Sequence, residues 1–174
     1  MNQYPKFIFL SFFALLTIAA PAQKTVKNYI KKYQGLAMEK SEKHGIPVSI
    51  ILGVSIVESA AGQSQICKAL NNFFGIKGKN QSSQKKMGYK SAYKQYASDE
   101  ESFEHFCQVL MKKKFYRKLK GSINYKEWLN QMNKSSYASA KQKWIDDITK
   151  NIKKFDLYKF DKEIKEDEKN TVLK

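Results

Sequence analysis

The fold class is decided by one stretch, Val48-Ser49-Ile50-Ile51-Leu52-Gly53-Val54-Ser55-Ile56-Val57-Glu58. Apolar residues face nearly every side of a helix built from this sequence, and such a helix belongs in the centre of a domain. Gly45 is suited to end the preceding helix, and Pro47 is suited to open this one. We therefore predict a central helix over residues 48–58 with the other elements packed around it.

Helical patterns flank this stretch on both sides. Val26, Ile30, Tyr33 and Ala37 recur at the spacing of one helical face and predict a helix over residues 25–43. Ser64 is suited to cap a short helix that runs to about Leu70. Ser98 and Glu101 form a capping box at the start of a further helix. Further helices are predicted over residues 125–132 and 138–155. The sequence therefore predicts an all-α domain.

Residues 75–98 differ in character, and we call them the small lobe. They are rich in Gly, Ser and Gln, with tyrosines at 89, 93 and 96. This composition is typical of turns and short strands rather than of helices. The predicted fold class is therefore all-α with a small β-hairpin or long loop as a separate lobe.

Composition limits the choice of partner. The 174 residues carry a formal net charge of +16, with 42% apolar and 13% aromatic residues, enough for one packed domain. Such a basic balance fits nucleic acid, an acidic membrane face or an anionic cell-envelope polymer. Two histidines and two cysteines give no metal-ligand spacing, so neither a metal site nor a cofactor is expected.

The first 22 residues predict the compartment. Lys6 precedes an apolar stretch over residues 7–20, which ends at Ala20-Pro21-Ala22, a small-x-small cleavage pattern. The stretch is shorter than the ~20 residues that span a bilayer, so it predicts a cleaved signal peptide, with an uncleaved anchor as the alternative. Export to the periplasm, the cell wall or the exterior excludes nucleic acid as a partner and leaves no stable membrane span after cleavage.

Export permits a disulfide, and Cys67 and Cys107 are the candidates for it. The pair fits one bridge or two buried thiols equally well. At the C-terminus, residues 162–174 are charged and lack apolar periodicity, so they predict a disordered tail after a domain over residues 24–161.

One carboxylate, that of Glu58, lies on the last turn of the most apolar helix. Burial disfavours its charged form and predicts a raised pKa, as a general acid requires. The small residues 59–62 that follow leave space beside it for a bulky ligand. The alternative is a glutamate that ends a helix at the surface.

Several motifs resemble one enzyme family. They are Val48-Ser49-Ile50-Ile51-Leu52, Glu58-Ser59, Gly62-Gln63-Ser64, Asn71-Asn72-Phe73-Phe74-Gly75-Ile76-Lys77, Tyr96-Ala97-Ser98, Glu101-Ser102-Phe103, Tyr125, Trp128, Ser136-Tyr137-Ala138 and Phe155-Asp156-Leu157. Together they resemble the glucosaminidase family of peptidoglycan hydrolases, lysozyme-like endo-β-N-acetylglucosaminidases found in autolysins and in flagellar rod-assembly hydrolases. The likeness covers residues 29–161.

The resemblance implies a lysozyme-like fold that acts on the glycan strands of peptidoglycan. It implies that Glu58 is the general acid and that Tyr137 stabilises positive charge or orients water. The implied substrate-binding residues are Ser59, Asn72, Phe74, Gly75 and Lys77. Phe74 is expected to offer a flat face to a sugar while Phe73 enters the core, and Gly75 is expected to allow close backbone approach.

The sequence departs from the family in its second carboxylate, which is expected in the small lobe. From Gly78 to Ser98 there is no Asp or Glu, and five lysines occur instead. Three interpretations follow: the acetamido group of the substrate acts as nucleophile, the protein is a lytic transglycosylase, or it binds glycan without cutting it.

A basic run over residues 111–120 interleaves lysines with aromatic side chains. In an exported protein it is either a solvated face or a contact for anionic envelope polymers, which are the second expected partner.

Overall fold

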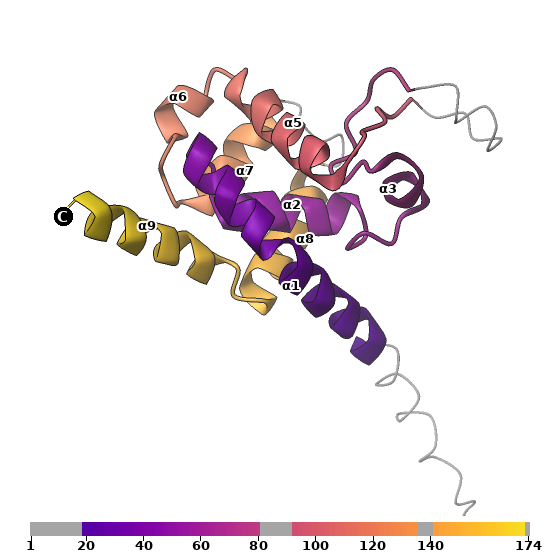
Figure 1. Ribbon diagram of the computed structural model, residues 1–174, viewed down its shortest axis with the longest axis horizontal. Coiled ribbons are helices and arrows are strands. Elements are labelled where there is room, and N and C mark those ends of the chain that lie inside the picture. The colour runs from indigo at the N-terminus through magenta and orange to yellow at the C-terminus, as the bar shows by residue number, and fades with distance from the viewer. Residues whose placement is uncertain (1–18, 81–91, 136–140, 173–174) are drawn as a thin grey trace, which may run out of the picture.

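The computed structural model describes residues 19–80, 92–135 and 141–172 (Figure 1). Its helices are α1 (Ala19–His44), α2 (Val48–Glu58), α3 (Gln65–Leu70), α5 (Asp99–Met111), α6 (Tyr116–Leu119), α7 (Tyr125–Lys134), α8 (Lys141–Lys154) and α9 (Tyr158–Val172). Most of the predicted signal peptide lies outside the described residues, and residues 19–22 belong to α1. Among the described helices, none has the length and apolarity needed to cross a membrane.

Helix α2 is the centre of the domain, as predicted. All of residues 48–56 are buried. Helices α1, α7, α8 and α9 pack around α2, so its apolar side chains have neighbours in every direction. Figure 1 shows α2 enclosed by these helices.

Gly53 sets how closely α8 approaches α2. A Cβ atom at this position would lie 3.0 Å from carbon atoms of both Ile148 and Ile152. Ile148 and Ile152 are fully buried and share one face of α8 with Trp144. The missing side chain therefore allows a close helix contact, which brings the start of α8 next to the end of α2.

The described ends of the small lobe pair as an antiparallel hairpin. Lys77 and Tyr93 form an isolated β-bridge. The amide of Gly78 donates to the carbonyl oxygen of Ala92 at 2.9 Å, and the amide of Lys94 donates to that of Ile76 at 2.8 Å. Residues 81–91, which join the two arms, lie outside the described residues.

Acidic side chains at the start of α5 pair with cations of α1. The nearly buried ammonium of Lys40 contacts Glu39 at 2.7 Å and Glu100 at 3.1 Å. The Glu104 carboxylate lies 3.2 Å from Lys43 and 3.0 Å from His44. Burial raises the pKa of Glu104, but the hydrogen bonds and charges of these partners lower it further, so the pKa falls to about 2. The acids of this region therefore serve the α1–α5 contact.

Both cysteines are free and buried. Of the two possibilities left open by the sequence, the structure therefore has two thiols rather than a bridge.

The prediction of a disordered tail is wrong for residues 162–172, which belong to α9. Leu157, Asp161 and Ile164 follow helical spacing and are all buried. An apolar periodicity cannot be recognised in the sequence here, because the middle one of these three buried positions is the aspartate Asp161.

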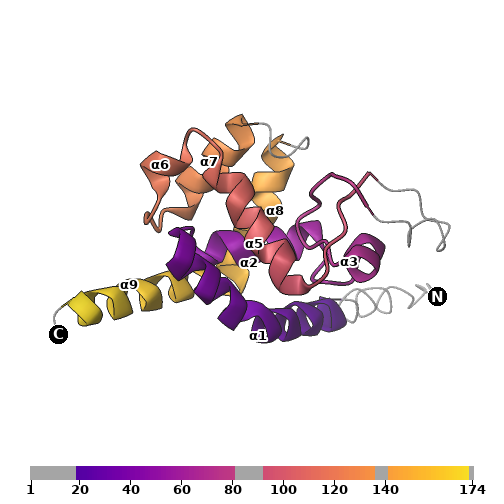
Figure 2. The same ribbon diagram turned by 45° about the horizontal axis from the view of Figure 1, so that its top comes forward.

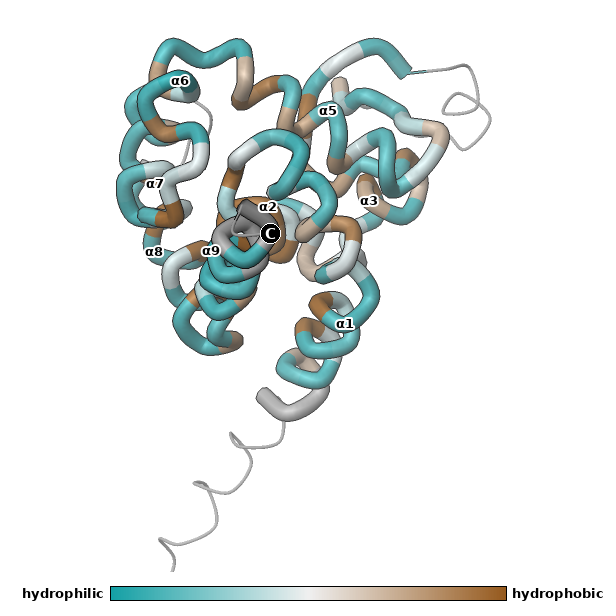
Figure 3. The backbone as a smooth tube through the Cα atoms, turned by 60° about the vertical axis from the view of Figure 1, so that its left-hand side comes forward, coloured by the Kyte–Doolittle hydropathy of each residue, from teal (hydrophilic) through white to brown (hydrophobic). Residues whose placement is uncertain are grey.

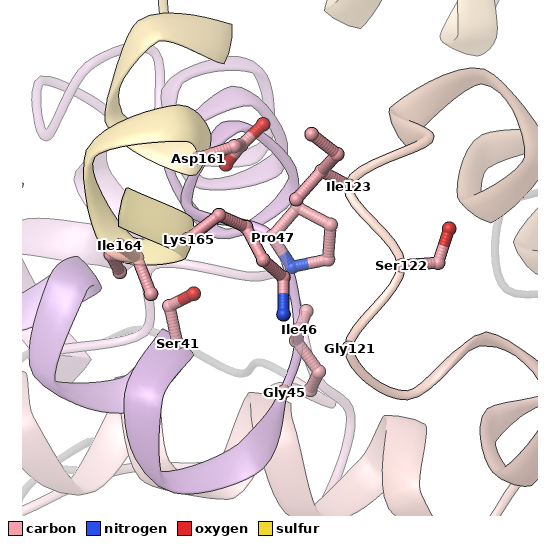
Figure 4. A pocket seen from close by; sticks show the side chains of 10 residues that line it. All are labelled: Ser41, Gly45, Ile46, Pro47, Gly121, Ser122, Ile123, Asp161, Ile164 and Lys165. Carbon is pink, nitrogen blue, oxygen red and sulfur yellow. The ribbon is translucent and has the colours of Figure 1, made fainter. Parts of the chain in front are cut away.

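Asp161 caps the central helix from a distant part of the chain. Pro47, which precedes α2, makes no side-chain cap. The amide of Ser49 instead donates to Oδ1 of Asp161 at 2.9 Å, and Figure 4 shows Asp161 near Pro47, where α2 begins. Asp161 is 2% exposed, and burial raises its pKa to about 6 despite hydrogen bonding from Ser49.

This burial predicts a specific pH dependence for Asp161→Asn. The native state binds the Asp161 proton more tightly than the unfolded chain, so the wild type loses stability as pH rises from about 4 to about 6. The asparagine keeps an acceptor for the Ser49 amide but does not titrate. Relative to the wild type, the variant should gain on the order of 3 kcal/mol between pH 4 and pH 7.

The measurement is the free energy of unfolding by urea at several pH values. Asp146→Asn, at an exposed position of α8, is the matched control and should follow the wild-type pH dependence. Parallel curves for Asp161→Asn and the wild type would contradict the assignment.

Candidate active site

The site is built around Glu58, the last residue of α2. Its side chain is partly buried, and two other parts of the chain approach its carboxylate from different sides. These are α8, through Trp144, and the entry to the small lobe, through Gly75.

Trp144 holds one oxygen of the carboxylate. Its indole Nε1 donates to Oε1 of Glu58 at 2.7 Å. Burial raises the pKa of Glu58 above its ordinary value, and the hydrogen bond from Trp144 offsets part of that rise. A carboxyl group in this environment is available in its protonated form as a general acid.

Gly75 faces the other oxygen. Its φ is +63°, and a Cβ atom there would lie 2.9 Å from Oε2 of Glu58 and 3.9 Å from a ring carbon of Tyr93. A side chain at this position would therefore meet the carboxylate. The close approach observed at Gly75 is to Glu58, and its approach to a substrate stays a prediction.

The turn after Glu58 is strained. Ala60 and Ala61 have φ of +50° and +51°, a left-handed conformation that costs a non-glycine residue roughly 1 kcal/mol or more. Ser59 fastens this turn: its hydroxyl donates to the carbonyl oxygen of Ser55 at 2.6 Å and accepts from the amide of Gly62 at 2.8 Å. Ser59 is fully buried, so its predicted substrate contact is wrong and its role is to shape the turn.

Asn72 is also structural. It is 1% exposed, and its amide donates to the carbonyl oxygens of Ile76 at 2.9 Å and Lys94 at 2.7 Å. Its own Oδ1 accepts from the Ile76 amide at 3.1 Å. These bonds tie the two arms of the hairpin together, and they correct the prediction that Asn72 binds substrate.

Phe74 is not in a cleft. It is 2% exposed, and its ring stacks on Phe106 with centroids 4.1 Å apart. Phe73 is buried as well, among Tyr33 and Phe103. The prediction that Phe74 faces a sugar is therefore wrong, because both neighbouring phenylalanines enter the aromatic core beneath the small lobe.

Two other predicted residues remain untested. Lys77 is exposed and forms the hairpin bridge with Tyr93, so it stays a candidate for substrate binding. Tyr137 lies outside the described residues.

The acids nearest the small lobe in sequence are already engaged. Asp99 accepts from the hydroxyl of Tyr33 at 2.6 Å, and Glu101 accepts from the amide of Ala97 at 2.7 Å. Both lie in the first turn of α5, as the capping box predicted. In the part of the chain that the structure describes, no group of three His, Cys, Asp or Glu residues could hold a metal.

Sequence reasoning missed Trp144 and Tyr93. Trp144 follows the apolar period of α8, which predicts a core residue, and nothing in that pattern shows that its N–H points at a carboxylate. Tyr93 is one of the tyrosines of the small lobe, and the sequence pattern gives it no role of its own. It is partly exposed, and its ring lies near Gly75.

Comparison with known proteins identifies the family. A profile of the glucosaminidase family, described as mannosyl-glycoprotein endo-beta-N-acetylglucosaminidase, matches residues 34–157. The chain belongs to the glucosaminidase family of glycoside hydrolases. It is 26% identical over 149 residues to the exo-glucosaminidase LytG of Bacillus subtilis. The alignment covers 76% of this chain and 52% of LytG. The chain thus spans about half the length of that relative.

Two solved structures share the fold of this glucosaminidase-family chain. The catalytic domain of the autolysin Auto from Listeria monocytogenes matches with a TM-score of 0.62 at 19% identity, over 88% of this chain and 99% of that domain. The glycoside hydrolase domain of Salmonella typhimurium FlgJ matches with a TM-score of 0.55 at 18% identity, over 84% of this chain and 94% of that domain. The expected lysozyme-like, mostly helical fold is confirmed.

Trp144→Phe tests how the acid is held. The phenylalanine keeps the packing but removes the hydrogen bond that lowers the pKa of Glu58. The pKa should rise further, so the alkaline limb of kcat/KM for glycan cleavage should move to higher pH than in the wild type. Trp128→Phe is the control, because it removes an indole bond to the carbonyl oxygen of Ser122, away from Glu58. An unshifted limb in Trp144→Phe would contradict the role.

Gly75→Ala tests the second contact. An added methyl group meets Oε2 of Glu58 and sits in a left-handed backbone conformation. We expect a destabilisation of about 1–3 kcal/mol and at least a tenfold loss of kcat. In Gly35→Ala, where a Cβ atom would have no neighbour within 4 Å, stability should be unchanged or raised. Thermal unfolding and turnover of the two variants provide the comparison, and full activity in Gly75→Ala would refute the contact.

Proposed function

We propose that this protein is a peptidoglycan hydrolase that cleaves the β-1,4 glycosidic bond after N-acetylglucosamine. One observation carries the proposal: the Glu58 carboxyl group has a raised pKa and is positioned by Trp144 and Gly75 at the end of a rigid buried helix. Family membership supports the reaction class. The substrate fits the names of the relatives, an exo-glucosaminidase and an autolysin.

In the first step, Glu58 donates its proton to the glycosidic oxygen as the bond to C1 breaks. Positive charge then develops on C1 and the ring oxygen, as in other glycosidases. The hydrogen bond from Trp144 stabilises the carboxylate that remains on Glu58. That carboxylate is then placed to accept a proton from the water that completes hydrolysis, which restores the acid.

The second participant is proposed to be the substrate itself. The small lobe lacks Asp and Glu from Gly78 to Ser98, and the nearby acids Asp99 and Glu101 are engaged at the start of α5. The acetamido oxygen of N-acetylglucosamine can attack C1 and form a cyclic oxazolinium ion, which water then opens with retention of configuration. Tyr137 is proposed to border the same site and to orient this water or stabilise the charge.

Two alternatives use the same site. A lytic transglycosylase also needs one acid, because a hydroxyl group of the sugar attacks C1 in place of water, and the missing second carboxylate favours that chemistry equally. A silent glycan-binding protein would use the same site without turnover, but the positioned acid argues against it.

The location follows from the substrate. A peptidoglycan hydrolase acts in the periplasm or outside the cell, which agrees with a signal peptide over residues 1–22. The partners are then glycan strands, with anionic envelope polymers as the additional expectation from the basic charge.

Incubation of the purified protein with peptidoglycan and mass spectrometry of the products tests the proposal. Reducing N-acetylglucosamine ends are expected, whereas anhydro-muramic ends would identify the lyase. Fragment sizes separate release of single sugars from internal cutting. Binding without any product would overturn both enzymatic proposals.

Glu58→Gln should lower kcat by at least about 1000-fold and keep the fold, because the amide cannot donate a proton to the leaving oxygen. Glu42→Gln, at an exposed position of α1, is the matched control and should retain full activity. Circular dichroism checks the fold, and product release measures the rate. Turnover of Glu58→Gln at the wild-type rate would refute the assignment.

A further inference from the structure

One corner of the molecule carries a dense positive charge that the fold does not use. We call residues 112–120, from the end of α5 through α6, the α6 corner. Its cations are Lys112, Lys113, Lys114, Arg117, Lys118 and Lys120. Lys113 is partly buried and the other five are exposed. No Asp or Glu occurs between Glu104 and Glu127, so the sequence supplies no local counter-charge.

The α6 corner also lacks partners from elsewhere. Among the residues that the structure describes, none forms an ion pair with these six cations. The α1–α5 contact is different, since Lys40 and Lys43 are paired with acids of α5. Cations at the end of α5 gain from the helix dipole, but this explains Lys112 to Lys114 and not the cations of α6, a helix of four residues.

Two exposed apolar side chains flank this charge in the sequence. Met111 and Ile123 are each 42% exposed, and they are the exposed large hydrophobic residues among the described part of the chain. Both lie within three residues of the α6 corner. Figure 3 shows the tube at this end as mainly hydrophilic, with hydrophobic segments interspersed.

A surface of this kind suits an amphiphilic anionic partner. A soluble polyanion would neutralise the cations but would gain nothing from the methionine and isoleucine side chains. An anionic phospholipid bilayer offers both phosphate groups for Lys and Arg and an apolar boundary for Met111 and Ile123. We propose that the α6 corner binds the surface of an anionic phospholipid membrane.

The position of the α6 corner is compatible with the proposed function. Figures 1 and 2 both show α6 at one end of the molecule and α3 with the small-lobe segment at the other. Contact through α6 would therefore leave the small lobe directed away from the bilayer, towards the wall. This orientation rests on the proposed function, whereas the binding itself does not.

The test uses the full chain with an environment-sensitive fluorophore on a cysteine introduced as Met111→Cys. Cys67 and Cys107 are buried, which favours labelling at the new position. Vesicles of phosphatidylglycerol and phosphatidylcholine should shift the emission to the blue, and vesicles of phosphatidylcholine alone should not. A label at Gln65→Cys, exposed on α3 at the other end, should not respond. The N-terminal apolar segment is the same in both proteins and cannot produce this difference.

Charge reversal tests the cations. Lys114→Glu, Arg117→Glu and Lys118→Glu together should lower partitioning onto the anionic vesicles by more than about tenfold. The control combines Lys27→Glu, Lys31→Glu and Lys68→Glu, which change the net charge equally at exposed positions of α1 and α3. This control should bind nearly as well as the wild type. Thermal unfolding verifies that both variants fold.

Three outcomes would overturn the proposal. They are no response of the Met111→Cys label to anionic vesicles, equal losses in the two charge variants, and an equal blue shift with soluble polyphosphate. The last outcome would assign the α6 corner to a soluble polyanion. Because no peptidoglycan is present in this assay, its failure would leave the proposed hydrolase activity unaffected, and an inactive enzyme could still bind the vesicles.

Discussion

Helix α2 has no side facing solvent along residues 48–56, and the arrangement of the other helices follows from that burial. A fully enclosed helix still has polar groups at its two ends. At the first end, Pro47 provides no side-chain cap, and Asp161 of α9 accepts the Ser49 amide. At the second end, the Glu58 carboxylate is partly removed from water and is met by Trp144 and Gly75. Both ends of the helix are therefore completed by residues far away in sequence.

This arrangement links stability to chemistry. The burial that makes α2 the domain centre also raises the pKa of Glu58. The close contact between α2 and α8 at Gly53 brings the Trp144 indole to Glu58, and its hydrogen bond offsets part of this rise. The strained turn at Ala60 and Ala61 is held by Ser59, itself a buried residue of the same region. The Glu58 carboxyl group is thus held by rigid elements, as its proposed role of proton donor with a defined direction requires.

Charge is distributed unevenly over the same framework. Acids at the start of α5 are used in contacts with α1, whereas the α6 corner keeps six cations with no described counter-charge. The net charge of +16 is therefore not a uniform property of the surface. Part of it stabilises helix packing, and part of it is available to a partner.

The sequence by itself determined most of the helices, though not α6 or α9, together with the central place of α2 and the capping box of α5, because these depend on local periodicity and capping chemistry. It also singled out Glu58 as the candidate acid. It could not decide which polar or aromatic residue of a motif faces the ligand. Ser59, Asn72 and Phe74 are buried, and Asp161 and Trp144 act on α2 across 112 and 86 residues of chain. Only the tertiary structure decided these roles, because burial and hydrogen-bond direction depend on neighbours that periodicity does not specify.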